Sequence, residues 1–157
     1  MDIMLDLETL SSRPDAAIVA IGACTFSDQG PSDEDARKTF YCIVSARNAQ
    51  AFSGRIDAET VAWWARQSDE VRSILNDNDA MPIHLALDAF DYFVGGCGAG
   101  VRVWGNGASF DNVVLRESYQ RLGRKEPWKY TDERCYRTLR KLRPDIGPLA
   151  RAGVEHN

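Results

Sequence analysis

The sequence has only four cysteines, two histidines and no long apolar run. The cysteines form no C-x-x-C pair, which argues against a zinc site or thioredoxin-like chemistry and predicts free thiols in a reducing compartment. No apolar segment approaches the ~18 residues needed to cross a membrane. The N-terminal segment Met1–Asp6 is acidic where a signal peptide would be basic. We therefore expect a soluble, cytoplasmic protein with no membrane partner.

Internal repeats, low-complexity tracts and Pro- or Ser-rich linkers are also missing, so no domain boundary is indicated. A chain of 157 residues that is 44% hydrophobic and 10% aromatic can bury an ordinary core by packing alone. We therefore expect a single domain over residues 1–157.

Charge is divided unevenly along the chain. The net charge of -4, taken alone, argues weakly against a nucleic-acid partner, because phosphate binding normally uses Lys and Arg. Residues 1–115 carry 8 basic and 17 acidic side chains, whereas residues 116–157 carry 11 basic and 6 acidic ones. Two interpretations of the basic part stay open: a solvated helix face, or a phosphate track beside an acidic, metal-binding pocket. Its basic positions include Arg116, Arg121, Arg124, Lys125, Lys129, Arg134, Arg137, Arg140, Lys141 and Arg143.

The order of the expected elements indicates an α/β fold, with helices packed on a mixed sheet. Apolar patterning predicts strands over residues 2–7, 17–26, 39–45 and 101–104, and a hairpin loop over residues 27–37. Helices are expected over residues 58–67, from residue 69, over 82–95, from 109 to 123 and over 131–142. The expected N-caps of three of these helices are Asp57, Ser68 and Ser109. The helix over 82–95 is expected to bury the rows Leu85, Ala89, Phe93 and Ala86, Phe90.

Two acids, Asp6 and Glu8, come at the end of the first expected strand. Residues two apart on a strand point to the same side, so both carboxylates project together and could touch one metal ion. Charges inside the apolar run over residues 3–5 would be costly to bury unless they coordinate something. The alternative interpretation is two exposed acids at a fraying strand end.

A third acid, Asp111, is expected in the first turn of the helix after Ser109. An acid there is commonly only a partner of the helix dipole. However, it follows a glycine-containing loop between a strand and a helix, and sites assemble in such loops at the carboxyl ends of strands. An unperturbed histidine side chain changes charge near neutral pH, so a residue of the type of His156 suits a general base that deprotonates a water held by metal. For His84 a surface or core role is expected.

Several segments together resemble the DEDD family of 3'-5' exonucleases. The segment Asp6–Leu10 resembles the first motif of that family, and Gly105–Asp111 resembles the second. The terminal Val154–Asn157 resembles the start of the third motif, the H-x4-D form that defines the DEDDh branch. The sequence is most similar to the small bacterial and phage 3'-5' exoribonuclease-like group, in which Asp57–Thr60 leading into Trp63–Gln67 is also typical.

The resemblance implies a ribonuclease-H-like fold and hydrolysis of phosphodiesters at the 3' end of RNA, or of DNA, to nucleoside 5'-monophosphates. It implies that Asp6 bridges two divalent ions, that Glu8 binds one of them and that Asp111 binds the other. His156 would be the general base. Paired ions can activate the attacking water and stabilise the leaving oxygen. Hard oxygen ligands favour Mg²⁺ or Mn²⁺ over zinc.

The resemblance also implies substrate contacts around a free 3' end. Thr9 and Leu10 would lie beside the terminal sugar and base, with Leu10 as a wedge. A tryptophan pair on a helix cannot point both rings the same way, so at least one ring is expected in the core. The expected substrate-binding residues are Thr9, Leu10, Trp63 or Trp64, Gln67, Asn106, Ser109 and Phe110. The family includes dimers, so a homodimer stays an open alternative.

The third motif departs from the family pattern, because it needs an acid five residues after His156 and the sequence ends at Asn157. The C-terminal helix that carries this acid is therefore expected to be missing or truncated. One interpretation is a shortened form of a longer active enzyme. The other is a non-catalytic module that binds nucleic acid or another partner without cutting. A general phosphatase or nucleotide hydrolase is a weaker third hypothesis.

Overall fold

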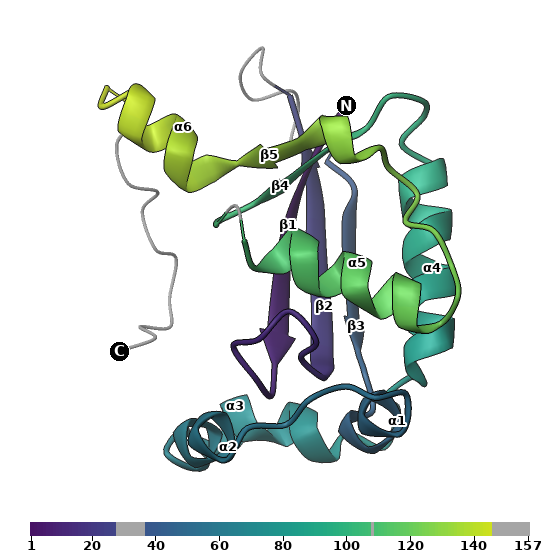
Figure 1. Ribbon diagram of the computed structural model, residues 1–157, viewed down its shortest axis with the longest axis vertical. Helices are drawn as coiled ribbons and strands as arrows, with labels where there is room; N and C mark the ends of the chain where they lie inside the picture. Colours follow the sequence, from purple (N-terminus) through teal and green to yellow (C-terminus); the bar gives the residue numbers. More distant parts are fainter. Residues whose placement is uncertain (28–36, 108, 146–157) are drawn as a thin grey trace.

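The computed structural model describes residues 1–27, 37–107 and 109–145. A five-stranded sheet in the order β3-β2-β1-β4-β5 forms its centre (Figure 1). β1 pairs antiparallel with β2 and β2 antiparallel with β3, whereas β4 runs parallel to β1 and β5 parallel to β4. This mixed sheet, flanked by helices, confirms the predicted α/β class and the predicted mixed sheet. The strands are β1 (Asp2–Thr9), β2 (Ile18–Phe26), β3 (Thr39–Ile43), β4 (Arg102–Gly105) and β5 (Glu133–Cys135).

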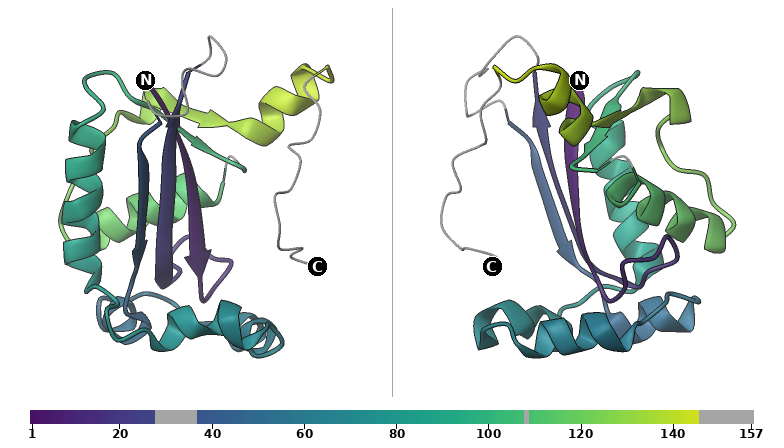
Figure 2. Two further views of the ribbon diagram at one scale, coloured as in Figure 1. Left: turned by 180° about the vertical axis from the view of Figure 1, so that it is seen from behind. Right: turned by 60° about the vertical axis from the view of Figure 1, so that its left-hand side comes forward.

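The helices fall into three groups around the sheet. α4 (Ile83–Gly95) and α5 (Asp111–Arg121) lie on one side of the long strands in the views of Figures 1 and 2. α1 to α3 gather beyond the carboxyl end of β1, and α6 follows β5 at the opposite end of the molecule. Their bounds are α1 (Ala46–Ala51), α2 (Ala58–Ala65), α3 (Asp69–Arg72) and α6 (Tyr136–Leu142), with 3-10 turns at Ser73–Asn76 and Tyr130–Asp132.

Side chains alternate along β1 between two different environments. Ile3, Leu5 and Leu7 are buried in the same core cluster as Phe90 of α4 and Leu115 of α5. The residues between them point to the other side of the strand, where Asp6 is exposed and Glu8 half-buried. We call this second side of the sheet the acid face. The alternation therefore places both predicted carboxylates together, away from the core.

Several predicted elements are confirmed with small shifts at their ends. Ser68 caps α3 as expected, because its hydroxyl accepts a hydrogen bond from the Val71 N–H. Asp57 occupies the expected N-cap position of α2, but its side chain accepts a hydrogen bond from the Ser11 hydroxyl at 2.6 Å and makes no capping hydrogen bond. α1 was not predicted. Most of the expected hairpin loop at 27–37 lies outside the described residues.

Two helix predictions are wrong in part. In α4 the buried row is Ile83, Ala86, Leu87, Phe90 and Val94, whereas Leu85 is exposed. The helix expected over residues 131–142 is instead a 3-10 turn, the short strand β5 and then α6. Pairing of β5 with β4 explains this difference, because contacts between distant segments override local helix preference.

The four cysteines are free thiols, as predicted. Within the described ranges, the helices are all too short or too polar to span a membrane.

Candidate active site

The sheet opens next to β1 where its ladder with β4 ends. The two parallel strands pair only from Asp2 opposite Arg102 to Met4 opposite Trp104. Beyond this point the carboxylate of Asp111, at the start of α5, accepts a hydrogen bond from the Leu7 N–H at 3.2 Å. Asp111 is 4% exposed. The side chain of Asp111 thus continues the hydrogen bonding of β1 and is fixed beside the strand that carries Asp6.

Gly105 allows this close approach of α5 to the sheet. A Cβ atom at Gly105 would lie 2.6 Å from Asn112 Oδ1 and 3.2 Å from Asp111 Oδ2. Asn112 is itself buried, and its amide donates to the Val103 carbonyl at 3.0 Å. The glycine at the end of β4 is therefore a packing requirement of Asp111 and Asn112.

On the acid face, the carboxylates border a pocket of about 260 Å³. The register of the strands places Asp6, Gly22 and Tyr41 side by side at the floor of the pocket, because Asp6 pairs with Gly22 and Gly22 pairs with Tyr41. A Cβ atom at Gly22 would lie 3.8 Å from the Tyr41 ring and 3.6 Å from the Asp6 carbonyl oxygen, so the glycine keeps the surface beside the ring free of side-chain atoms. We call this the acid pocket; its lining residues are Asp6, Glu8, Ala20, Gly22, Tyr41, Trp64, Val71 and Ile74.

The electrostatics show that the acids influence one another. Burial raises the pKa of Asp111, and the negative charge of Asp6 raises it further. Hydrogen bonds from backbone N–H groups, including that of Leu7, lower the pKa of Asp111. Burial and then the charge of Glu8 raise the pKa of Tyr41. Negative charge is thus concentrated around the pocket and the adjacent end of β4, where a cation would reduce the repulsion.

The donor chemistry of Asp6, Glu8 and Asp111 fits a hard divalent cation, because all three side chains offer carboxylate oxygens. Over residues 1–27, 37–107 and 109–145, no three His, Cys, Asp or Glu side chains converge closely enough to form a preformed metal cluster. The three carboxylates therefore supply suitable ligand atoms, and they would have to draw closer together around a bound ion.

The two tryptophans of α2 have different surroundings, as their adjacent positions predict. Trp64 is 2% exposed, and its indole N–H donates to the Thr9 carbonyl at 2.9 Å. It contributes to the wall of the acid pocket. Trp63 is only partly buried and meets Trp64 edge-on, with ring centroids 5.4 Å apart. Trp64 is therefore the tryptophan that the fold brings to the acids.

Three other expected contact residues are occupied by interactions within the protein. Leu10 is 5% exposed and belongs to the core cluster. Thr9 is buried, and its hydroxyl donates to the Ser11 carbonyl at 2.7 Å. The Gln67 amide donates to the Trp63 carbonyl at 3.1 Å.

The loop between β4 and α5 holds the remaining expected residues. Asn106 and Ser109 are exposed, and Phe110 is partly buried against the core. Ser109 is not the N-cap of α5, because Phe110 takes that position without a side-chain cap. His156 and the expected truncation of the third motif lie outside the described residues.

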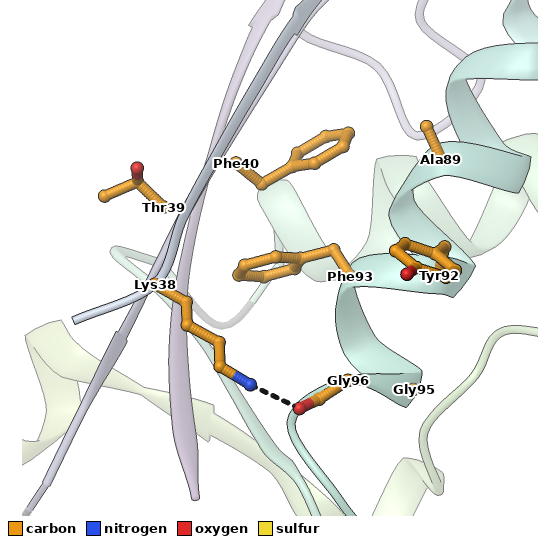
Figure 3. A pocket seen from close by; sticks show the side chains of 8 residues that line it. All are labelled: Lys38, Thr39, Phe40, Ala89, Tyr92, Phe93, Gly95 and Gly96. Carbon is orange, nitrogen blue, oxygen red and sulfur yellow. Dashed lines mark hydrogen bonds between the residues drawn. The ribbon is translucent and has the colours of Figure 1, made fainter. Parts of the chain in front are cut away.

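A larger pocket lies on the other side of the sheet (Figure 3). It has a volume of about 900 Å³ and is mainly apolar, between β3 and the end of α4. Phe40 lines it, whereas the next residue, Tyr41, belongs to the acid face. The Lys38 ammonium in this pocket donates to the Gly96 carbonyl at 2.5 Å. No carboxylate is among its lining residues, so the acid pocket is the better candidate for catalysis.

Sequence reasoning missed Tyr41 and Gly22 as parts of the site. Tyr41 is 63% exposed although it lies in the centre of a strand. The alternation of buried and exposed side chains along β3, and the small residues of β2, are signals for an open face of the sheet. The pairing of Gly22 with Asp6, however, depends on the register of two antiparallel strands. That register cannot be read from residues so far apart without the fold.

The sequence matches the family described as the 3'-5' exoribonuclease Rv2179c-like domain over residues 1–157. No curated protein matches the chain. Among solved structures the chain is similar to cell-death related nuclease 4 (CRN-4), with 12% sequence identity and a TM-score of 0.46. This similarity covers 69% of the chain and 36% of the CRN-4 chain.

Proposed function

Because the chain belongs to the 3'-5' exoribonuclease Rv2179c-like domain family, we propose that it is a metal-dependent 3'-5' exonuclease. Its substrate would be RNA with a free 3' end, and its product nucleoside 5'-monophosphates. The observation that carries the proposal is the position of Asp111, which hydrogen-bonds β1 between the two residues Asp6 and Glu8.

Asp6, Glu8 and Asp111 would hold two Mg²⁺ or Mn²⁺ ions. When bound, such ions supply positive charge at the phosphate that is hydrolysed and favour ionisation of the attacking water. The Leu7 N–H fixes the orientation of the Asp111 carboxylate, and β1 fixes the spacing of the other two. His156 would accept the proton of the water as general base.

The acid pocket would receive the terminal nucleotide. Ala20 and Gly22 line the pocket with small side chains or none, and Tyr41 and Trp64 line it with aromatic rings. Tyr41 is the more accessible of the two rings. We therefore assign to Tyr41 the stacking contact with the terminal base, and to Trp64 the support of the wall and of the backbone at Thr9.

Replacement of Tyr41 by alanine is expected to raise the KM for short RNA roughly fivefold to a hundredfold, with a smaller change in kcat. The reason is that a base loses one aromatic stacking partner, a contact of about 1–3 kcal/mol. The Tyr41→Phe variant keeps the ring and should behave like the unmodified protein. Steady-state kinetics on a trinucleotide would measure both. Equal losses in the two variants would show that the hydroxyl, and not stacking, is the important feature.

The proposal is tested by incubating the protein with RNA and DNA oligonucleotides of one sequence, each with Mg²⁺, Mn²⁺ or EDTA. We expect shortening of RNA that requires a divalent ion and stops in EDTA. Binding that persists in EDTA without shortening under any ion condition would favour the non-catalytic binding module. Turnover of mononucleotides without turnover of oligonucleotides would favour a nucleotide hydrolase.

A further inference from the structure

A basic groove lies beside the loop that leads from β4 to Asp111. It has a volume of about 380 Å³ and is lined by Asn106, Arg137, Arg140 and Lys141. The Arg137 N–H donates to the Asn106 carbonyl at 3.1 Å, which ties the start of α6 to this loop. A Cβ atom at Gly107 would lie 3.7 Å from the Arg137 guanidinium. The basic groove and Asp111 are therefore connected through the same short loop.

Most other arginines of the basic C-terminal part neutralise groups within the protein. Arg116 pairs with Glu126 and Glu133, Arg124 with Asp88 and Asp91, and Arg143 with Asp145. Arg121 and Arg134 donate to backbone carbonyls. These contacts give the five arginines a structural explanation.

The cations of the basic groove differ from those arginines. Arg137, Arg140 and Lys141 are exposed, and within the described part of the chain none forms an ion pair with a carboxylate. No acid is among the lining residues, and Arg140 lies over the Tyr136 ring at 5.9 Å from its centroid. Three cations and an amide thus converge on one open groove, where their charge is available to an external anion.

We propose that the basic groove binds the phosphodiester backbone of single-stranded RNA next to the nucleotide held in the acid pocket. This inference rests on the proposed function. Guanidinium groups bind phosphate through paired N–H donors, and the lysine adds a point charge. Contacts of this kind are independent of base sequence and weaken as salt rises. The groove would hold an RNA strand in place while its 3' end reaches the carboxylates.

The test compares the unmodified protein with the triple variant R137Q/R140Q/K141Q. Binding of a 5'-fluorescein-labelled 20-nucleotide RNA is followed by anisotropy in EDTA over a range of KCl concentrations. Three lost phosphate contacts are expected to reduce the slope of log affinity against log salt by about 2, and each single substitution by about 0.7. Circular dichroism checks that each variant is folded.

The matched control is R47Q/K125Q/K129Q, which removes the same charge from exposed positions outside the groove. Its slope is expected to stay near that of the unmodified protein. An unchanged slope in the groove variant, or an equal reduction in the control, would overturn the inference. Loss of adenosine 5'-monophosphate binding with unchanged RNA binding would also overturn it, since the groove would then hold a free phosphate group.

The nuclease assay is kept separate from the binding assay. If the unmodified protein binds RNA through the groove but never shortens it, the proposed function fails while the groove assignment stands. If it shortens RNA and the groove variant binds as tightly as the unmodified protein, the groove assignment alone fails.

Discussion

The Asp6→Asn variant is expected to lose RNA shortening by more than ~100-fold in kcat, while RNA binding in EDTA is kept. Changes in residues that merely support metal ligands typically cost ~10–100-fold, so loss of a direct ligand should exceed that range. Asp6 is exposed on the acid face and borders the pocket that also contains Glu8. Its replacement by an amide of equal size removes negative charge without opening a cavity.

The matched control for Asp6→Asn is Asp79→Asn, an exposed carboxylate in a surface turn. It should keep full activity and the same melting temperature as the unmodified protein. Retention of more than about a tenth of the activity in Asp6→Asn would mean that the carboxylate is not a direct metal ligand.

The Gly105→Ala variant is expected to be both less stable and less active. The added methyl group would lie 2.6 Å from Asn112 Oδ1 and 3.2 Å from Asp111 Oδ2, so both buried side chains must move. Overpacking of this kind costs about 1–3 kcal/mol of unfolding free energy. For a chain of this size the melting temperature should fall by roughly 2–12 °C. Displacement of Asp111 by about 1 Å could reduce activity by ~100-fold.

Gly107→Ala is the control for this effect within the same loop. A methyl group there would have only ordinary contacts, with Arg137 at 3.7 Å. Thermal unfolding and kcat should therefore change much less in Gly107→Ala than in Gly105→Ala. Equal effects in both variants would indicate that the glycines act through the flexibility of the loop, and not through the packing of Asp111.

The sequence predicts the first four strands because their apolar patterns are local. It also places Asp6 and Glu8 on one side of β1, since a strand alternates with a period of two. The position of β5 could not be predicted in this way. Its three residues gain strand structure only by pairing with β4, a segment about thirty residues away in the sequence.

In the site, too, the sequence predicts the local motifs but not the contacts between residues that are distant in the chain. The motif around Gly105 and Asp111 is visible in the sequence, but the hydrogen bond from Leu7 to Asp111 joins residues 104 positions apart. Sequence reasoning could not choose between Trp63 and Trp64 either. The choice depends on the Thr9 carbonyl, which the fold brings to the indole of Trp64.

The basic positions of residues 116–157 show why charge patterning alone left two interpretations open. Arg116 and Arg124 pair with acids of the same fold, whereas Arg137 and Arg140 line an open groove. A count of charges cannot separate these groups, because the separation depends on which carboxylates lie nearby.

The direction of digestion distinguishes removal of nucleotides from the 3' end from other modes of RNA cleavage. RNA labelled at its 5' end, with either a free or a blocked 3' end, would be incubated with the protein and Mn²⁺ and analysed over time by gel and mass spectrometry. We expect a ladder of 5'-labelled products that shorten one nucleotide at a time, release of nucleoside 5'-monophosphates, and protection of the blocked RNA. Immediate release of the 5' label, or internal fragments from both substrates, would show that the protein is not a 3'-5' exonuclease.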